Sequence, residues 1–194
     1  MELKEAIYKR ISVRKYEDTP VPQKVLQELL EGACMAPSGI NQQPWYFLAI
    51  TNEADRQRYL SFMEEGFSRF RPILEKRFSR NPEVVEKTGT FMTTLGGAPV
   101  VILAFLLKDD YLKTNGGRPA IQGVAAAIEN LLLLAHDRGL AGCWMTSPVD
   151  FGLGDALRQV FAPEKGELLA VISLGYPKES PTAPPRREGR FDII

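Results

Sequence analysis

The sequence predicts a single α+β domain in which helices are layered on a mixed β-sheet. Two amphipathic helical patterns come first, and the strand-like runs that follow are separated by further helical segments. The length of 194 residues fits one domain with a sizeable core, and the chain contains no internal repeat and no domain linker. We therefore treat residues 1–194 as one domain, with 176–194 as an extended C-terminal arm, because that segment is rich in proline and charge.

The N-terminal quarter is predicted to contain two helices and one strand. Residues 3–11 carry apolar side chains at helical spacing, and this pattern ends near the segment "RISVRKY". A second helix follows "TPVP", with Pro22 suited to its first turn. The apolar side of this helix consists of Val25, Leu26, Leu29, Leu30 and Ala33. After a polar loop, the apolar run "WYFLAIT" at 45–51 predicts a compact strand.

The middle of the chain is less informative. Residues 53–95 are charged and helix-prone, and we expect Pro72 and Pro82 to break them into shorter pieces. The run "PVVILAFLLK" at 99–108 is β-branched and apolar at its start, which suits a strand buried on both faces. The turn-rich segment "KTNGGRP" at 113–119 follows it.

The C-terminal half begins with a long helix over 120–138. It is apolar nearly all round, so it must be covered on nearly all sides. A second copy of the chain could supply part of that cover, since symmetric dimers are the commonest assemblies. Two further strands are predicted, "GLAGCWMT" at 139–146 and "ELLAVISLGY" at 167–176, with a short helix at 151–161 between them.

The composition narrows the class of protein. Lys plus Arg equals Asp plus Glu at 24 each, which argues against a general nucleic-acid binder because such proteins carry a basic excess. Cys34 and Cys143 form no disulfide framework, and we expect buried thiols in a reducing cytoplasm. The N-terminus lacks a signal-peptide core, and the apolar tract 124–135 is interrupted by Glu129 and Asn130 and is too short to span a bilayer. We expect a soluble, cytoplasmic protein with no nucleic-acid or membrane partner.

Several common catalytic motifs are absent from the sequence. It contains no G-x-G-x-x-G, no P-loop and no G-x-S-x-G elbow. His136 is the only histidine, and its position beside Asp137 and Arg138 suggests a helix C-terminus, where a cation is favourable. We therefore predict no metal site and no catalytic acid or base, and we expect a bound cofactor to carry any redox chemistry.

Three polar residues near the N-terminus form one candidate binding motif. In "YKRISVRKYED", Arg10 and Arg14 share one side in either a helix or an extended chain, and Ser12 joins them only in an extended chain. Two guanidinium groups and a hydroxyl on one side would suit a phosphate monoester. The alternative is a solvated basic helix end, with Lys9 and Lys15 as further surface charges.

The loop "APSGINQQPW" is the second candidate motif. Its side chains able to hydrogen-bond a ligand are Ser38, Asn41, Gln42 and Gln43. Such a set, with backbone donors freed by a turn at Gly39, would suit a planar heterocycle that carries carbonyls, ring nitrogens and a polyol chain. The alternative is an Asx-type turn, although turn chemistry does not explain two glutamines before Pro44.

Two later segments add weaker signals. Small residues at Gly139, Ala141 and Gly142 would allow close backbone approach, or simply tight packing at a strand start. In the proline-rich tail, Arg186 and Arg187 could contribute to the same phosphate site or only to solubility.

Taken in order, these segments resemble the FMN-dependent nitroreductase family. The segment "RISVRKY" is similar to the family's Arg-x-Ser-x-Arg motif, and "APSGINQQPW" is similar to its Pro-Ser-x-x-Asn-x-Gln-Pro-Trp loop. An apolar helix leading into "RGLAGCW" follows, and the chain closes with "SLGYP" and a basic tail. The resemblance runs from about Ala6 to Arg187.

The resemblance implies a three-layer α/β/α fold with a mixed, mainly antiparallel sheet, in an intertwined homodimer with FMN at the subunit interface. It implies a ping-pong reaction in which NADH or NADPH reduces FMN, which then reduces a nitroaromatic, a quinone or a similar small aromatic acceptor. A flavin-dependent reductive dehalogenase, or a flavin- or nucleotide-binding regulator without turnover, is the alternative on this scaffold.

The resemblance also assigns the cofactor contacts. Arg10, Ser12 and Arg14 would hold the phosphate and ribityl end of FMN from one subunit. The loop residues of the other subunit that would contact the flavin are Pro37, Ser38, Gly39 and Asn41, with Gln43 supporting the loop. The segment whose backbone approaches the flavin ring is matched by Met145, Thr146 and Ser147. Arg186 or Arg187 would supply the C-terminal phosphate ligand.

Two departures from the family pattern concern the flavin ring. Members often supply a further polar or basic contact from the middle helices, for which Arg56 and Arg71 are the candidates here. The acidic residue that some members carry after the "GLG" strand is replaced by Thr146, Ser147 and Pro148.

Overall fold

The computed structural model describes residues 1–107 and 117–194. Its α-helices are α1 (Leu3–Lys9), α2 (Gln23–Ala33), α3 (Glu53–Arg77), α4 (Pro82–Thr94), α5 (Arg118–Asp137), α6 (Ser147–Asp150) and α7 (Gly154–Phe161), with 3-10 turns η1 (Gly39–Asn41) and η2 (Leu95–Gly97). Its strands are β1 (Trp45–Ile50), β2 (Val100–Leu106), β3 (Ala141–Met145) and β4 (Leu168–Gly175). The predicted N-terminal helices, long helix and four strands are confirmed to within a few residues. The predicted turn at 113–119 and the end of the 99–108 strand lie partly outside the described residues.

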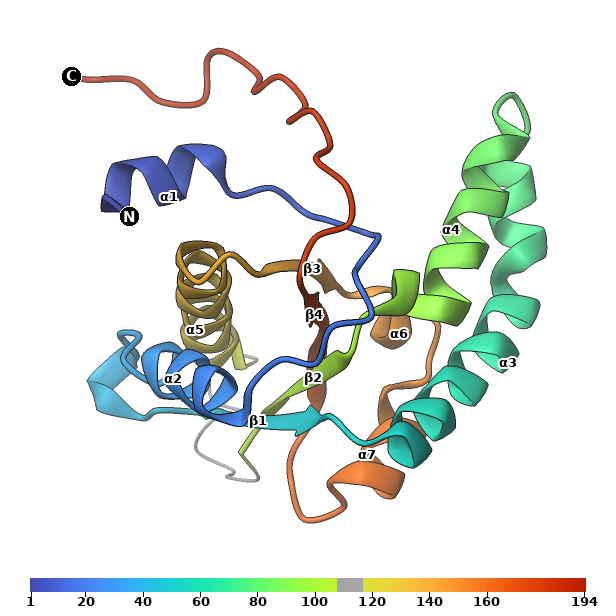
Figure 1. Cartoon of the computed structure of the whole chain (residues 1–194), viewed down its shortest axis with the longest axis horizontal. Coiled ribbons are helices and arrows are strands. Elements are labelled where there is room, and N and C mark those ends of the chain that lie inside the picture. Colours follow the sequence, from blue (N-terminus) through green and yellow to red (C-terminus); the bar gives the residue numbers. More distant parts are fainter. Residues whose placement is uncertain (108–116) are drawn as a thin grey trace.

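Within the described residues the four strands form one sheet in the order β1-β2-β4-β3 (Figure 1). Each neighbouring pair is antiparallel, so the expectation of a mixed sheet is wrong. Helix α5 does connect two strands that point the same way, β2 and β3, as a crossover helix usually does. However, β4 is inserted between them and runs opposite to both, which makes every adjacent pair antiparallel.

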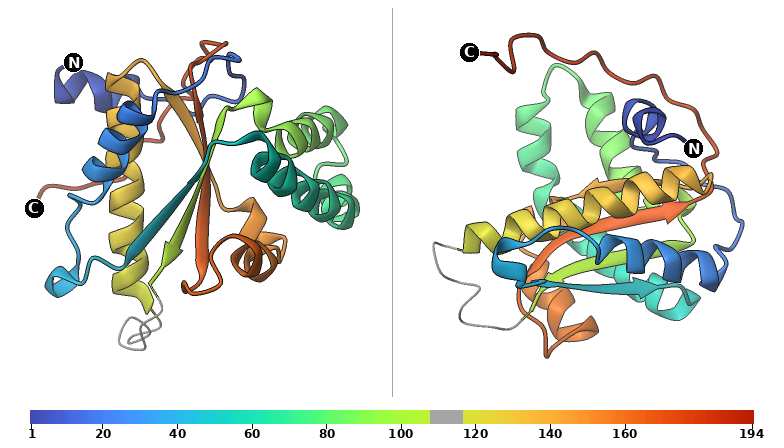
Figure 2. Two further views of the ribbon diagram at one scale, coloured as in Figure 1. Left: turned by 60° about the horizontal axis from the view of Figure 1, so that its bottom comes forward. Right: turned by 90° about the vertical axis from the view of Figure 1, so that its left-hand side faces the viewer.

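Alternating side chains of the sheet build a core on each of its faces. Val101, Leu103 and Phe105 point to the side covered by α3, α4 and α7. Their neighbours Ile102 and Ala104 point to the side covered by α2 and α5. The sheet is therefore the middle of three layers, as Figure 2 shows, and β2 is buried on both faces as its apolar sequence predicts.

Helices α3 and α4 form an antiparallel pair that projects from one side of the domain (Figure 1). Pro82 starts α4, but α3 continues through Pro72, so the predicted break there is wrong. Pro72 has no N–H to donate to the Ser68 carbonyl, so this carbonyl lacks its usual helical hydrogen bond. Both residues are exposed to solvent, and water can donate to the carbonyl instead. Close packing holds the pair together, since a Cβ at Gly89 would come within 2.4 Å of the Phe67 ring.

Helix α5 packs on the sheet beside α2 and is the most apolar helix described. By length and composition alone it could cross a membrane, with a mean hydropathy of 1.2 over its most apolar window, of which 44% is buried in the chain. Its buried side chains lie against β2, β4 and α2, which is the environment of a core helix. Ala125, Ala126 and Leu133 are only half-buried, so the described residues of one chain do not cover this helix completely.

Candidate functional site

The segment from Arg10 to Tyr16 is extended and lies between β3, η2 and the C-terminal arm. The Val13 N–H donates to the Gly142 carbonyl at 3.3 Å, and the Tyr16 N–H donates to the Gly96 carbonyl at 2.9 Å. The buried Tyr16 hydroxyl donates to the Val13 carbonyl at 2.6 Å and lies 2.9 Å from the Ser173 hydroxyl. The segment thus has the extended conformation that Ser12 needs in order to share a side with Arg10 and Arg14.

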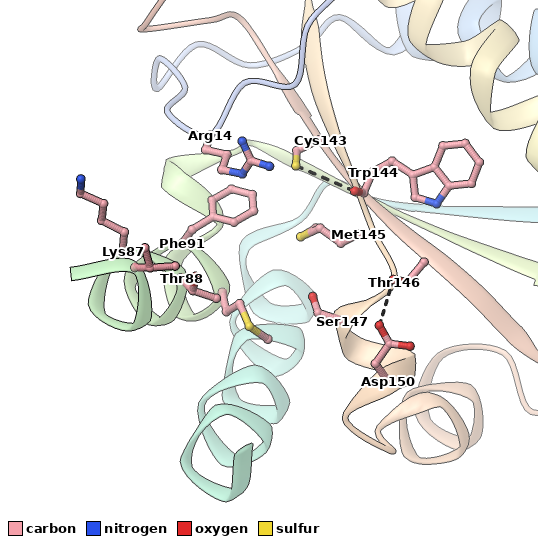
Figure 3. A pocket seen from close by; sticks show the side chains of 12 residues that line it. Arg14, Lys87, Thr88, Phe91, Cys143, Trp144, Met145, Thr146, Ser147 and Asp150 are labelled. Carbon is pink, nitrogen blue, oxygen red and sulfur yellow. Dashed lines mark hydrogen bonds between the residues drawn. The ribbon is translucent and has the colours of Figure 1, made fainter. Parts of the chain in front are cut away.

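A cavity of about 490 Å³, which we call the β3 cavity, lies beside this segment (Figure 3). Its lining residues come from the N-terminal segment, α4, the end of β3 and α6: Arg14, Val84, Lys87, Thr88, Phe91, Met92, Cys143, Trp144, Met145, Thr146, Ser147 and Asp150. In Figure 3 the side chains of Cys143 and Met145 point into the cavity, whereas the Trp144 ring points away to the α5 side of the sheet. The structure therefore brings four of the candidate cofactor-binding residues, Arg14, Met145, Thr146 and Ser147, to one cavity.

The walls of the β3 cavity combine apolar side chains with positive charge. The Arg14 guanidinium lies 5.7 Å from the centre of the Phe91 ring, a cation–π contact that orients the side chain. The backbone N–H of Arg14 donates to the Glu179 carboxylate at 2.9 Å, which ties the arm to this segment. Lys87 adds a second cation from α4. Such a cavity suits a flat, apolar group that carries polar or negatively charged edges.

Cys143 is a buried thiol near the N-terminal motif. Burial raises the pKa of its thiol, while Arg14, a hydrogen bond with Ser12, and Arg10 each act to lower that pKa. All three side chains are therefore close enough to this thiol to affect its ionisation. Cys143 is buried, as predicted, but Cys34 is exposed, so the expectation of two buried thiols is wrong for Cys34.

Arg10 also borders a second cavity of about 340 Å³, which we call the α5 cavity. It lies where α1, the end of α5, the start of β3 and the arm meet, and its lining includes Arg10, Val13, Leu132, His136, Gly142 and Glu179. The Arg10 Nε atom lies 3.2 Å from the Glu129 carboxylate, yet it is buried and makes no well-aligned hydrogen bond among the described residues. We take this contact as an ion pair without a directed hydrogen bond, which leaves Nε available to a ligand.

The loop at 36–44 is held mainly by its own side chains. The Gln43 N–H donates to the Ser38 hydroxyl at 2.9 Å, and the Gln43 side-chain amide donates to Asn41 at 3.2 Å. The 3-10 turn η1 spans Gly39–Asn41, so the turn predicted at Gly39 is present, and the positive φ angles of the loop fall on Ile40, Asn41 and Gln43. Three strained non-glycine residues in one loop cost free energy, and such strain is concentrated at functional sites.

The loop and the N-terminal segment contact different parts of α5. Gly39 lies against Pro119, and Ser38 lies against Gly123, both near the start of the helix. Arg10 instead pairs with Glu129. At 1.5 Å per residue, Pro119 and Glu129 are about 15 Å apart along the helix axis. In Figure 2 the loop lies beside the start of α5 and the N-terminal segment lies beside its end, so one chain does not bring the two predicted halves of the site together.

The remaining predicted contacts lie elsewhere. Arg186 and Arg187 are exposed in the part of the arm that leaves the domain on the side of α1 (Figure 1), and neither residue lines either cavity. Arg56 donates to the Pro99 carbonyl, and Arg71 pairs with Glu75 and Glu86, so neither reaches the β3 cavity.

The sequence analysis missed the contribution of α4. One face of this helix lines the β3 cavity, because the α4 residues in the lining are spaced at i, i+3, i+4 and i+7: Val84, Lys87, Thr88 and Phe91. That spacing is visible in the sequence, but no residue pattern near it indicates that this face of the helix borders a cavity.

Asp150 was also missed. Its carboxylate accepts a hydrogen bond from the Thr146 hydroxyl at 3.0 Å. An acidic group therefore lines the β3 cavity from α6, beyond the positions Thr146, Ser147 and Pro148 where the sequence analysis noted its absence.

The sequence matches the nitroreductase family over residues 7–176. A putative NADH dehydrogenase/NAD(P)H nitroreductase from Methanothermobacter thermautotrophicus is 30% identical over 183 residues, covering 93% of this chain and 80% of that protein. An NADH dehydrogenase from Thermus thermophilus is 40% identical over 193 residues, covering 92% and 88%. A putative nitroreductase from Desulfovibrio desulfuricans, solved in complex with FMN, has the same fold, with a TM-score of 0.73, 23% identity, and coverage of 100% of this chain and 98% of that one.

Proposed function

Because the chain belongs to the nitroreductase family, we propose that it binds FMN in the β3 cavity and transfers a hydride from NAD(P)H to a nitroaromatic, a quinone or a similar acceptor. The observation that carries the proposal is the meeting of Arg14 with Met145, Thr146 and Ser147 around one cavity. A volume of about 490 Å³ with apolar walls is within the range of cofactor and substrate sites.

The chain's own residues fit the two ends of FMN. Phe91, Met92 and Met145 offer apolar surface for the flavin ring, and Arg14 and Lys87 offer positive charge near its carbonyl edge. The unpartnered Nε of Arg10 fits a phosphate oxygen. Bound FMN would supply hydride acceptance and donation, so no protein side chain is required to titrate during turnover.

We propose that the complete site forms between two copies of the chain. The loop residues Pro37, Ser38, Gly39 and Asn41 would then contact the flavin that is held by the other subunit. Two observations support this arrangement: the loop lies about 15 Å along α5 from Arg10, and the apolar side chains of Ile40 in the loop and of Met35 just before it are each 80% exposed. A partner subunit would cover both these side chains and the half-buried residues of α5.

The C-terminal arm and the cellular location are further parts of the proposal. Arg186 and Arg187 reach the phosphate only if the arm takes a different path when FMN and the partner are bound. The two unpaired cysteines, one of them exposed, suit a reducing cytoplasm.

The visible absorption spectrum of the purified protein tests the proposal directly. We expect a yellow protein with about one FMN per subunit, whose flavin absorbance is bleached by NADH or NADPH without oxygen. A colourless protein that takes up no added FMN would contradict the proposal. Tight FMN binding without oxidation of either nucleotide would instead indicate a regulator.

The acceptor can be identified after reduction of the bound flavin. We expect nitroaromatics and quinones to reoxidise it in a second, separate half-reaction, which gives ping-pong kinetics. Turnover of halogenated phenols without turnover of nitroaromatics would favour a reductive dehalogenase.

A further inference from the structure

The α5 cavity is lined by two residues that each carry a buried nitrogen atom without a hydrogen-bond partner. These atoms are Arg10 Nε and His136 Nε2, and neither makes a hydrogen bond within the described residues, although Arg10 Nε lies 3.2 Å from the Glu129 carboxylate as an ion pair. Buried polar groups are almost always paired, and leaving one unpaired costs free energy. The coincidence of two such atoms at one cavity of about 340 Å³ therefore indicates a ligand that accepts hydrogen bonds from both.

The charges around the cavity indicate that this ligand is an anion. Lys9, Arg10 and the Met1 ammonium line it together with His136. The single carboxylate in the lining, Glu179, already accepts a hydrogen bond from the Arg14 backbone. Arg10 cannot lose its charge at ordinary pH, and Glu129, with which it forms an ion pair, does not line the cavity, so the Nε N–H is a donor for an anionic ligand there.

His136 lies in the last turn of α5, with charged groups on several sides. Charged groups face it from every neighbouring element: Glu5, Lys9 and Arg10 from α1 and its end, the Met1 ammonium, Asp137 on α5 itself, and Glu179 on the arm. Lys9 pairs with Glu5, and Met1 pairs with Asp137, so most of these charges are matched.

The two cavities follow one another along β3. Ala141 and Gly142 line the α5 cavity, and Cys143 to Met145 line the β3 cavity. The segment from Arg10 to Arg14 runs beside the same strand, with Arg10 at one cavity and Arg14 at the other. An elongated ligand with a ring at one end and an anionic group at the other matches this arrangement.

We propose that His136 is a phosphate ligand of the bound flavin, donating from Nε2 beside Arg10 to the terminal phosphate of FMN. This inference rests on the proposed function, because it takes FMN as the occupant of the β3 cavity. It adds an uncommon feature to the site: a titratable group that recognises the phosphate and has no role in hydride transfer.

The test compares two flavins on flavin-free protein. FMN and riboflavin differ only in the phosphate, so their dissociation constants, measured by quenching of flavin fluorescence, report on the phosphate site alone. For His136→Leu we expect FMN affinity to fall about tenfold or more, and riboflavin affinity to change less than twofold. His136→Gln keeps an N–H donor without the charge, and we expect an intermediate loss.

Two controls separate a binding role from a structural one. Arg138→Gln removes a cation from the same helix end, where Arg138 pairs with Glu28 and does not line the cavity, so the ratio of FMN to riboflavin affinity should not change. Thermal unfolding of flavin-free His136→Leu should occur at the same or a higher temperature than in the unaltered protein, because the substitution removes an unpaired buried atom.

A spectroscopic measurement tests the contact itself. His136 is the only histidine, so its imidazole nitrogen resonances are assigned without ambiguity. At a fixed pH, FMN should shift these resonances and riboflavin should not, because only FMN carries the phosphate that His136 would contact. Equal FMN affinity in His136→Leu, or identical resonances with both flavins, would overturn the assignment of His136 while leaving the proposed function intact. Failure of the unaltered protein to bind either flavin would overturn both.

Discussion

Residues 10–16 and the loop at 36–44 are both expected to hold the cofactor, but different interactions hold them in place. Residues 10–16 are bound to distant parts of the chain, through Val13 to Gly142 and through Tyr16 to Gly96 and Ser173. The loop is bound mainly to itself, through Gln43 to Ser38 and Asn41. The first segment therefore takes its shape only once the sheet is assembled, whereas the second carries most of its structure locally.

The difference also concerns position. Each region contacts its own stretch of α5, and no described contact joins the two. A cofactor-binding motif can therefore be complete in the sequence although the site to which it belongs is incomplete in one chain.

Mixed dimers give the largest expected effect. One chain carries Arg10→Ala and Arg14→Ala, and the other carries Ser38→Ala and Asn41→Ala. If each site takes its two halves from different subunits, one of the two sites in the mixed dimer is intact, and FMN binds at about half occupancy. Each doubly substituted homodimer should bind FMN weakly at both sites. The measurement is the flavin content of mixed dimers, purified by selecting for a different tag on each chain. If the mixed dimer binds no more FMN than the two doubly substituted homodimers, both halves of the site act within one chain.

Arg14→Ala should weaken FMN binding about tenfold or more, because a charge-assisted contact is lost at the β3 cavity. Lys15→Ala is the matched control, since Lys15 is an adjacent exposed cation that does not line that cavity. Fluorescence titration of flavin-free protein measures both variants. Equal effects of the two substitutions would mean that only general positive charge matters at this segment.

Tyr16→Phe should lower the free energy of unfolding by about 1–3 kcal/mol, because the buried Val13 carbonyl and Ser173 hydroxyl lose a hydrogen-bond partner. Tyr59→Phe is the control: this hydroxyl is fully buried without a partner among the described residues, so its removal should leave stability equal or higher. Denaturant unfolding measures both. A stable Tyr16→Phe protein would show that residues 10–16 do not depend on this anchor.

Ser38→Ala gives the smallest expected effect. It removes the acceptor for the Gln43 N–H at an exposed loop, which should lower FMN affinity a few-fold and leave the unfolding midpoint almost unchanged. Ser61→Ala on α3 provides a control hydroxyl whose only described contact is with its own helix. A large loss of stability in Ser38→Ala would mean that the loop supports the fold as well as the ligand.

Much of the architecture was predictable because it depends on local patterns. Helical spacing in residues 3–11 and 22–33, and the apolar run at 99–108, depend on neighbours a few positions away. The errors at Pro72 and Cys34 share one cause, since both depend on whether a position meets solvent or other parts of the fold. The cavity residues Lys87 and Asp150 were missed for the same reason.

The sequence by itself determined the elements, the order of the motifs along the chain and the family to which they belong, because each of these depends on short-range spacing and residue type. Only the tertiary structure decided that β4 lies between β2 and β3, that Arg14 meets the end of β3, and that Arg10 and His136 share a cavity. These pairings join residues that are far apart in the sequence, by more than a hundred positions for the two that involve Arg14 and Arg10. They are selected by which faces bury the most apolar surface together, and no local pattern in the chain encodes that choice.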